Sequence, residues 1–167
     1  RLLLAGVSGG MVPLQEQTPE FWTEILKINL VGTFLAVKHA ARVMTPRGKG
    51  SIICTASVAG LRSGAGGSPY SASKAGLHRY LQSLRAELRG TPVAVTELAP
   101  GFIDTDLNRN KGARPFLIDV DKGAAIMARM IERQVGKRWV PVLPWTIIAQ
   151  LLKILPASVL APRQKRS

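Results

Sequence analysis

The sequence predicts an α/β fold, a doubly wound, partial Rossmann-like parallel sheet flanked by helices. Three observations indicate this fold. Apolar runs of strand length alternate with longer segments of helical period along the chain. The runs are apolar nearly throughout, as strands are when helices cover both faces of a parallel sheet. The segments between them are long enough for the right-handed crossovers that join parallel strands.

Four apolar runs have the length and composition of strands. The first three are almost entirely apolar, whereas the fourth is interrupted by prolines. We expect the strands at residues 1–5, 51–56, 92–99 and 137–144.

The first and longest helical segment covers residues 18–44. Thr18 followed by Pro19 is typical of an N-cap with proline in the first turn. Apolar residues then recur at steps of three and four. Asn29 and Gly32 are weak helix formers, so we expect a break near Asn29 and two separate helices.

Three later segments also have helical character. The strongest is 70–88, which ends before Gly90 and Pro92, two residue types that commonly terminate helices. The second is 119–135. The third, 145–155, is short and amphipathic and lies between two prolines.

Bulk composition indicates a globular protein with one hydrophobic core. The chain has 167 residues, of which 46% are hydrophobic and 20% charged, a balance that argues against disorder. It has no apolar run near the roughly 20 residues that span a bilayer, and its first residues do not have the pattern of a signal peptide. The single cysteine, Cys54, lies in a predicted strand and is interpreted as inert core. These features favour a cytoplasmic location.

Charge divides the chain unevenly. The net charge is +13, and residues 107–167 hold twelve Lys/Arg against three Asp/Glu. We expect residues 1–143 to form the sheet domain and residues 144–167 to form an amphipathic helix with a basic tail. No nucleic-acid-binding signature accompanies the charge, so a solvated basic surface is the favoured interpretation and no nucleic-acid partner is expected.

Polar residues follow several predicted strands, where the reactive groups of open parallel sheets gather. Ser57 comes directly after the second strand and opens a Gly/Ser-rich loop of thirteen residues, whose length indicates a function. Tyr70 and Lys74 begin the next helix. Pro100 with Gly101, and then Thr105, follow the third strand, and Asn29 lies in the helical region after the first.

Tyr70 and Lys74 share one helical face because four residues separate them. An ammonium about 4 Å from a phenol contributes roughly 4 kcal/mol at an effective dielectric near 20, which corresponds to about three pKa units. We therefore expect Lys74 to lower the pKa of Tyr70 towards that of a general acid/base. Ser57 would orient a carbonyl oxygen, and Asn29 would hold a water that links Lys74 to solvent.

Each of these residues also has a plain structural interpretation. A tyrosine and a lysine four apart occur by chance in many helices, Ser57 is a strand-end residue, and Asn29 is a helix cap. The joint spacing is more specific: Ser57 precedes Tyr70 by 13 residues, and the Pro-Gly pair follows Tyr70 by 30. His39 and His78 lie in helices without a pattern of metal ligands around them and are interpreted as surface or packing residues, so no metal site is expected.

Taken together, the motifs INLVGTF, GSIICTASVAG, YSASK and PGFIDT resemble those of the short-chain dehydrogenase/reductase family. The likeness covers roughly residues 1–107. It implies a Rossmann fold, NAD or NADP as the cofactor, and a small carbonyl or alcohol substrate. The loop residues and the apolar side chains Phe102, Ile103 and Leu107 suggest a partly apolar pocket for that substrate.

The resemblance also implies roles for single residues. Tyr70 would exchange a proton with the substrate oxygen, and Ser57 would orient the substrate. Lys74 would also bind the nicotinamide ribose. Ile103 and Thr105, in the segment after Pro100 and Gly101, would hold the nicotinamide amide.

Two departures from the family pattern stand out. The family's Asn-Asn-Ala-Gly is represented by Leu3, Leu4, Ala5 and Gly6, so only Ala5 and Gly6 remain to let the adenosine side of the cofactor approach the backbone. The Gly-rich dinucleotide fingerprint has no counterpart. We therefore expect a chain that starts at the family's fourth strand, with its first strand as an apolar edge that favours self-association into a homo-oligomer.

Three functions remain open at this point. The first is an NAD(P)-dependent oxidoreductase that interconverts a ketone or aldehyde and an alcohol. The second is an inactive remnant that cannot bind a dinucleotide. The third is a membrane-surface module that uses the C-terminal helix and the basic tail. For that helix, packing over the substrate cleft or against a second subunit is the favoured interpretation.

Overall fold

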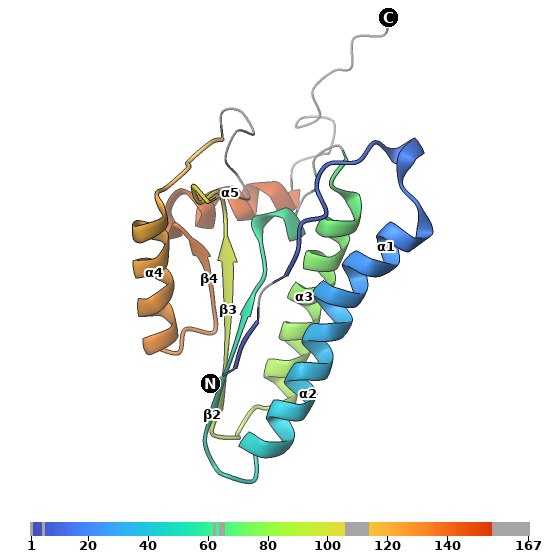
Figure 1. The fold of residues 1–167 in the computed structure, drawn as a ribbon. Coiled ribbons are helices and arrows are strands. Elements are labelled where there is room, and N and C mark those ends of the chain that lie inside the picture. The colour runs from blue at the N-terminus through green and yellow to red at the C-terminus, as the bar shows by residue number, and fades with distance from the viewer. Residues whose placement is uncertain (1, 5, 62, 64–65, 106–113, 155–167) are drawn as a thin grey trace, which may run out of the picture.

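The computed structural model describes residues 2–4, 6–61, 63, 66–105 and 114–154 (Figure 1). Four parallel strands form one sheet in the order β1-β2-β3-β4. Their bounds are Leu2–Leu4, Gly50–Thr55, Val93–Pro100 and Lys137–Val140. Chain order and spatial order therefore coincide, and β1 lies at an edge of the sheet, as predicted.

Helices cover both faces of the sheet, which confirms the predicted fold class (Figure 1). One layer contains α1, α2 and α3, the opposite layer contains α4, and α5 lies across the carboxyl end of the sheet. The helices span Pro19–Leu26, Thr33–Met44, Ser68–Glu87, Val120–Glu132 and Val142–Ile154. Two 3-10 turns, η1 and η3, cover Leu14–Glu16 and Val58–Gly60.

The alternation of side chains along β2 explains why its whole length is apolar. Ile52 and Cys54 pack in one cluster with Leu77 of α3, whereas Ile53 packs in a second cluster with Met130 of α4. Successive side chains of a strand point to opposite faces, so a strand between two helical layers needs apolar residues at every position. Burial also raises the pKa of the Cys54 thiol to about 12, which agrees with an inert core residue.

The predicted break near Asn29 is wrong. The backbone stays helical from α1 into α2 through a π-helical stretch, η2, at Lys27–Gly32. A wider π turn takes up an extra residue without ending the helix, and such turns are frequent at functional sites. Thr18 caps α1 as predicted, since its hydroxyl accepts a 3.2 Å hydrogen bond from the Phe21 amide.

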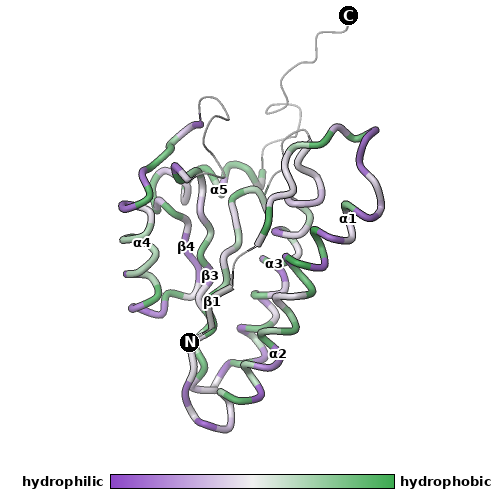
Figure 2. Tube along the Cα trace, viewed as in Figure 1, coloured by the Kyte–Doolittle hydropathy of each residue, from purple (hydrophilic) through white to green (hydrophobic). Residues whose placement is uncertain are grey.

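The C-terminal helix α5 contributes to the core. Trp145 and Ala149 are buried in the same cluster as α3, while Leu143, Ile147, Leu151 and Ile154 are exposed. Leu143 has an extended backbone, so the regular helix begins after it. Figure 2 shows the mostly hydrophobic character of α5. Within the described part of the chain, no helix combines the length and the apolar character that crossing a bilayer requires. The division at residues 143 and 144 stays a prediction.

Candidate active site

Ser57 lies just past the end of β2, on a turn that packs against α3. Its backbone is extended, and its hydroxyl accepts a 3.1 Å hydrogen bond from the Ala59 amide, so Ser57 caps η3. Gly60 touches α3 so closely that a Cβ there would lie 2.7 Å from the carbonyl carbon of Lys74. Only a glycine lets this turn approach the helix, and the close approach places Ser57 beside the first turns of α3.

Tyr70 and Lys74 lie on one face of α3, as their spacing predicts. The Lys74 ammonium donates a 2.8 Å hydrogen bond to the carbonyl of Thr55, the last residue of β2. The same nitrogen lies 5.7 Å from the centroid of the Tyr70 ring. The Ser57 hydroxyl is near enough to Tyr70 to lower the pKa of its phenol, against the effect of burial. The three residues therefore converge at the carboxyl end of β2.

The expectation that Lys74 lowers the pKa of Tyr70 is wrong for this chain. Burial raises the pKa of the Tyr70 phenol above its usual value, and the nearby Ser57 hydroxyl opposes this only in part. Burial also lowers the pKa of Lys74 to about 8. The ammonium lies over the face of the ring and bonds to Thr55, so desolvation of both groups outweighs their attraction.

Asn29 is fully buried in the π-helical stretch. Its side-chain amide donates to the carbonyl of Val7 at 2.9 Å and to the hydroxyl of Ser73 at 3.0 Å, and its carbonyl oxygen accepts from the Val7 amide at 2.8 Å. The side chain thus ties the segment after β1 to α3. Its predicted role as a water ligand stays a prediction.

Gly6 lies directly beside Asn29 and Lys74. A Cβ at Gly6 would collide with the Asn29 amide and would lie 3.2 Å from the Lys74 nitrogen. The absence of a side chain at residue 6 is what allows both residues to reach the end of β1. Ala5, its predicted companion, lies outside the described residues.

The segment after β3 reaches the same edge of the sheet. Pro100 ends β3, and the Gly101 amide donates a 2.8 Å hydrogen bond to Val140 at the end of β4. Ile103 is buried, and its carbonyl accepts a 2.8 Å bond from the Thr105 amide. Leu107 of the predicted pocket lies outside the described residues. The role of this segment in cofactor binding stays a prediction.

Sequence reasoning missed two residues beneath the site. His78 is a buried member of a polar cluster with Glu97, and Glu97 has no exposed surface. Two features of the sequence pointed to them. His78 lies one turn after Lys74 on the same helical face. Glu97 is the one charged residue inside a largely apolar buried strand, and a buried carboxylate requires partners.

Comparison with known protein families identifies the family of the chain. The family model described as short chain dehydrogenase matches residues 2–115. The chain belongs to the short chain dehydrogenase family. An uncharacterized oxidoreductase of Mycobacterium tuberculosis is 32% identical over 132 residues, which are 78% of this chain and 52% of that protein. A 3-oxoacyl-[acyl-carrier-protein] reductase of Aquifex aeolicus is 43% identical over 86 residues, which are 52% of this chain and 35% of that protein.

Solved structures of the family have the same fold. A gluconate 5-dehydrogenase from Burkholderia cenocepacia, in complex with NADP and tartrate, superposes with a TM-score of 0.59 at 31% identity. The superposition covers 65% of this chain and 43% of the dehydrogenase. The chain therefore spans about half, or less, of the length of the short chain dehydrogenases that it matches.

Proposed function

We propose that the chain carries the catalytic part of an NAD(P)-dependent oxidoreductase that interconverts a ketone or aldehyde and an alcohol. The convergence of Ser57, Tyr70 and Lys74 at one strand end carries the proposal. A proton donor, a hydroxyl and an ammonium around one point are what a carbonyl reduction needs from the protein. The related gluconate 5-dehydrogenase was solved with NADP, which supports the cofactor class.

The residues present fit the nicotinamide end of such a cofactor. Gly6 is exposed and lies next to Asn29 and Lys74, so its backbone is accessible beside the ammonium. Lys74 and Tyr70 would hold the ribose, and Ile103 and Thr105 would face the amide. The cofactor supplies or accepts the hydride, and the choice between NAD and NADP stays open.

Tyr70 acts as the general acid in the reducing direction. Its raised pKa keeps the phenol protonated at neutral pH, which is the state that can give a proton to a carbonyl oxygen. Ser57 donates a hydrogen bond to the same oxygen and so fixes its distance from Tyr70. Lys74, with a pKa of about 8, carries a positive charge for most of the time at pH 7 and stabilises the phenolate that forms.

A cofactor titration tests this function and distinguishes an active enzyme from an inactive remnant that cannot bind a dinucleotide. The intrinsic fluorescence of NADPH and of NADH is followed as the chain is added, and turnover is measured with a panel of small ketones and aldehydes. We expect saturable binding of one cofactor, and turnover that Tyr70→Phe removes while the melting temperature of the variant stays that of the parent. Absence of binding at millimolar cofactor contradicts the proposed oxidoreductase function and favours an inactive remnant.

A contact with a membrane surface is a second candidate, because α5 exposes an apolar stripe. Leu143, Ile147, Leu151 and Ile154 are 65%, 59%, 45% and 77% exposed, and the C-terminal part of the chain is strongly basic. Co-sedimentation with anionic vesicles tests the stripe. Ile147→Ser with Leu151→Ser should abolish pelleting, whereas Val43→Ser on α2, also exposed, should not.

We also propose that the chain self-associates through the outer surface of α2 and η2. Ile28, Val31, Phe34 and Leu35 are each more than 40% exposed. Exposed apolar residues grouped on one face commonly mark a protein interface. Light scattering coupled to size exclusion should show an oligomer that Phe34→Ser with Leu35→Ser converts to a monomer.

A further inference from the structure

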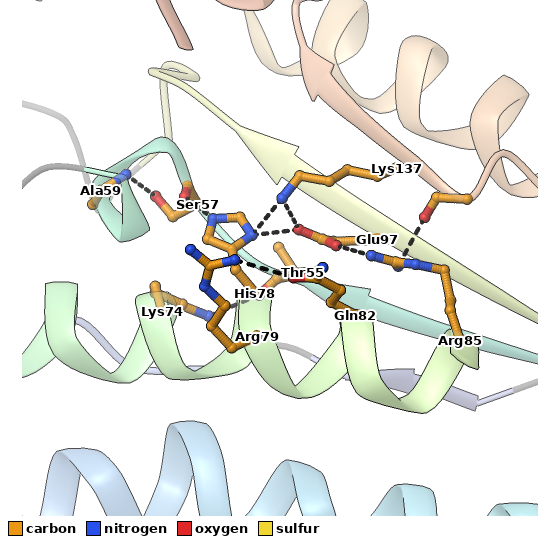
Figure 3. A network of polar contacts seen from close by, with 11 residues as sticks. Thr55, Ser57, Ala59, Lys74, His78, Arg79, Gln82, Arg85, Glu97 and Lys137 are labelled. Atoms are coloured by element: carbon orange, nitrogen blue, oxygen red, sulfur yellow. Dashed lines mark hydrogen bonds and ion pairs between the residues drawn. The ribbon is translucent and has the colours of Figure 1, made fainter. Parts of the chain in front are cut away.

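A cluster of charged residues around the buried Glu97 lies between α3, β3 and β4, next to Ser57 of the candidate active site (Figure 3). It consists of Glu97 with His78, Arg85 and Lys137 as its partners. Figure 3 shows that the cluster continues through His78 to Ser57, one of the residues of the candidate site.

Glu97 is the anchor of this cluster. One carboxylate oxygen binds the ammonium of Lys137 at 2.7 Å and Nδ1 of His78, and the other binds the guanidinium of Arg85 at 2.8 Å. Arg85 is fixed in turn by a 3.1 Å bond to the carbonyl of Gly136. Both carboxylate oxygens therefore have partners inside the protein. Glu97 holds other side chains in place and does not face a ligand.

His78 transmits this anchoring to the site. Its Nε2 lies 2.9 Å from the backbone carbonyl of Ser57. A carbonyl oxygen only accepts, so Nε2 carries a proton and donates it. Nδ1 faces Glu97 and also lies 2.9 Å from the Lys137 ammonium, while the ring meets Trp139 edge-on with centroids 5.8 Å apart. The imidazole is thus fixed at both nitrogens.

The bond from His78 acts on the backbone of the turn that presents the Ser57 hydroxyl. The carbonyl of Ser57 accepts from His78 and from the Gly60 amide at 3.1 Å, and its hydroxyl accepts from the Ala59 amide at 3.1 Å. A rotation of this peptide would move the hydroxyl relative to Tyr70. The donor on His78 opposes that rotation because its own ring cannot turn.

We propose that His78, held by Glu97, is a positioning residue for Ser57. The proposal rests on the proposed function and deepens it. His78 transfers no proton in the reaction; it fixes the peptide from which the Ser57 hydroxyl reaches the substrate oxygen. A cluster that only stabilised the fold would affect the melting temperature, but it would not act on catalysis through Ser57.

The substitutions His78→Gln and His78→Leu separate these two roles. Glutamine places an N–H donor where Nε2 lies, whereas leucine of similar size has none. With the full chain as the enzyme, we expect His78→Leu to lower kcat at least tenfold with less than threefold change in KM. His78→Gln should remain within threefold of the parent in both constants. An equal loss of kcat in the two variants overturns the proposal.

A double-mutant cycle shows whether the effect passes through Ser57. In a Ser57→Ala background, the loss caused by His78→Leu should shrink to less than threefold, because the hydroxyl that His78 positions is gone. The same tenfold loss in both backgrounds means that His78 acts elsewhere, and the proposal then fails.

Amide hydrogen exchange decides the proposal even if the chain shows no turnover. We expect exchange at the Ala59 and Gly60 amides to be at least tenfold faster in His78→Leu than in the parent, and unchanged in His78→Gln. Exchange that stays the same in His78→Leu overturns the proposal. Failure of the proposed function is recognised separately, as absence of NADH and NADPH binding by the parent chain.

Discussion

Lys74 donates a 2.8 Å hydrogen bond to the carbonyl of Thr55, which joins the first turns of α3 to the end of β2. The lysine is only 3% exposed, and burial lowers its pKa to about 8. A buried cation at this position destabilises the fold near neutral pH. The free energy of removing the ammonium from water is larger than the free energy gained from one hydrogen bond to a neutral carbonyl.

Replacement of Lys74 by methionine should therefore stabilise the fold at pH 7. The folded pKa lies below the unfolded value, so the folded chain binds fewer protons between about pH 8 and 10.5, and the parent gains stability as pH rises through that window. We expect Lys74→Met to raise the free energy of unfolding by about 1–2 kcal/mol at pH 7, net of the lost hydrogen bond, and by less at pH 10. Urea denaturation at both pH values measures this, with exposed Lys122→Met as the control. Equal effects at the two pH values would contradict it.

Glu97 should determine part of the acid stability. Burial alone would raise its pKa, but hydrogen bonds from His78, Lys137 and Arg85 outweigh burial and lower the pKa to about 2. A carboxyl with a lowered folded pKa stabilises the fold above its unfolded pKa, and this contribution is lost as pH falls from about 4.5 to 2.

The variant Glu97→Gln tests this contribution. It removes the negative charge and leaves three basic groups together, so the free energy of unfolding at pH 7 should fall by about 3–5 kcal/mol. The dependence of stability on pH below 4.5 should also become shallower than in the parent. Exposed Glu87→Gln is the matched control. A loss below about 1 kcal/mol would show that the charge of Glu97 contributes little to holding the three basic groups together.

The two tyrosines should both titrate above the usual range. Burial raises the pKa of Tyr70 and of Tyr80, and the chain contains no other tyrosine. A raised pKa means that the neutral phenol is favoured in the folded state, so stability is lost as pH rises through the folded value. Ultraviolet titration of the parent, Tyr70→Phe and Tyr80→Phe assigns each step. A tyrosine that ionises below pH 10 and is absent from Tyr70→Phe would contradict the burial argument.

Gly60→Ala should disturb the contact between η3 and α3. A Cβ at residue 60 would approach the backbone of Lys74 and the ring of His78 to less than 3 Å. We expect a loss of about 1–3 kcal/mol in the free energy of unfolding, together with faster amide exchange at Ala59. Gly136→Ala is the control, since the nearest atom to its Cβ would be 4.0 Å away. Equal melting temperatures of the two variants would contradict the close contact between η3 and α3 at Gly60.

Asn29→Leu should weaken the connection between the segment after β1 and α3. It leaves the amide and carbonyl of Val7 and the hydroxyl of Ser73 without their partner, which we expect to cost about 2–4 kcal/mol. Chemical denaturation measures the loss. Asn29→Asp retains the acceptor for Val7 and should cost less, and the reverse order would contradict the bonding seen here.

Sequence alone determined the architecture of this protein. Apolar strands alternating with helical segments indicate helices on both faces of a parallel sheet, because only that arrangement buries strands such as 51–56 on both sides. The order of Ser57, Tyr70 and Lys74 in the sequence also predicted that they meet at the end of β2, and the structure brings them together there, since helix and strand periods fix which residues share a face and an edge. Their roles as a site stay a prediction.

Tertiary structure alone decided how these groups are held and charged. Three features depend on residues that are far apart in the sequence. They are the continuous helix through Asn29, the raised pKa of Tyr70, and the contact from Glu97 through His78 to Ser57. Burial and the partners of a buried charge are set by packing between elements, and local patterns do not contain that information.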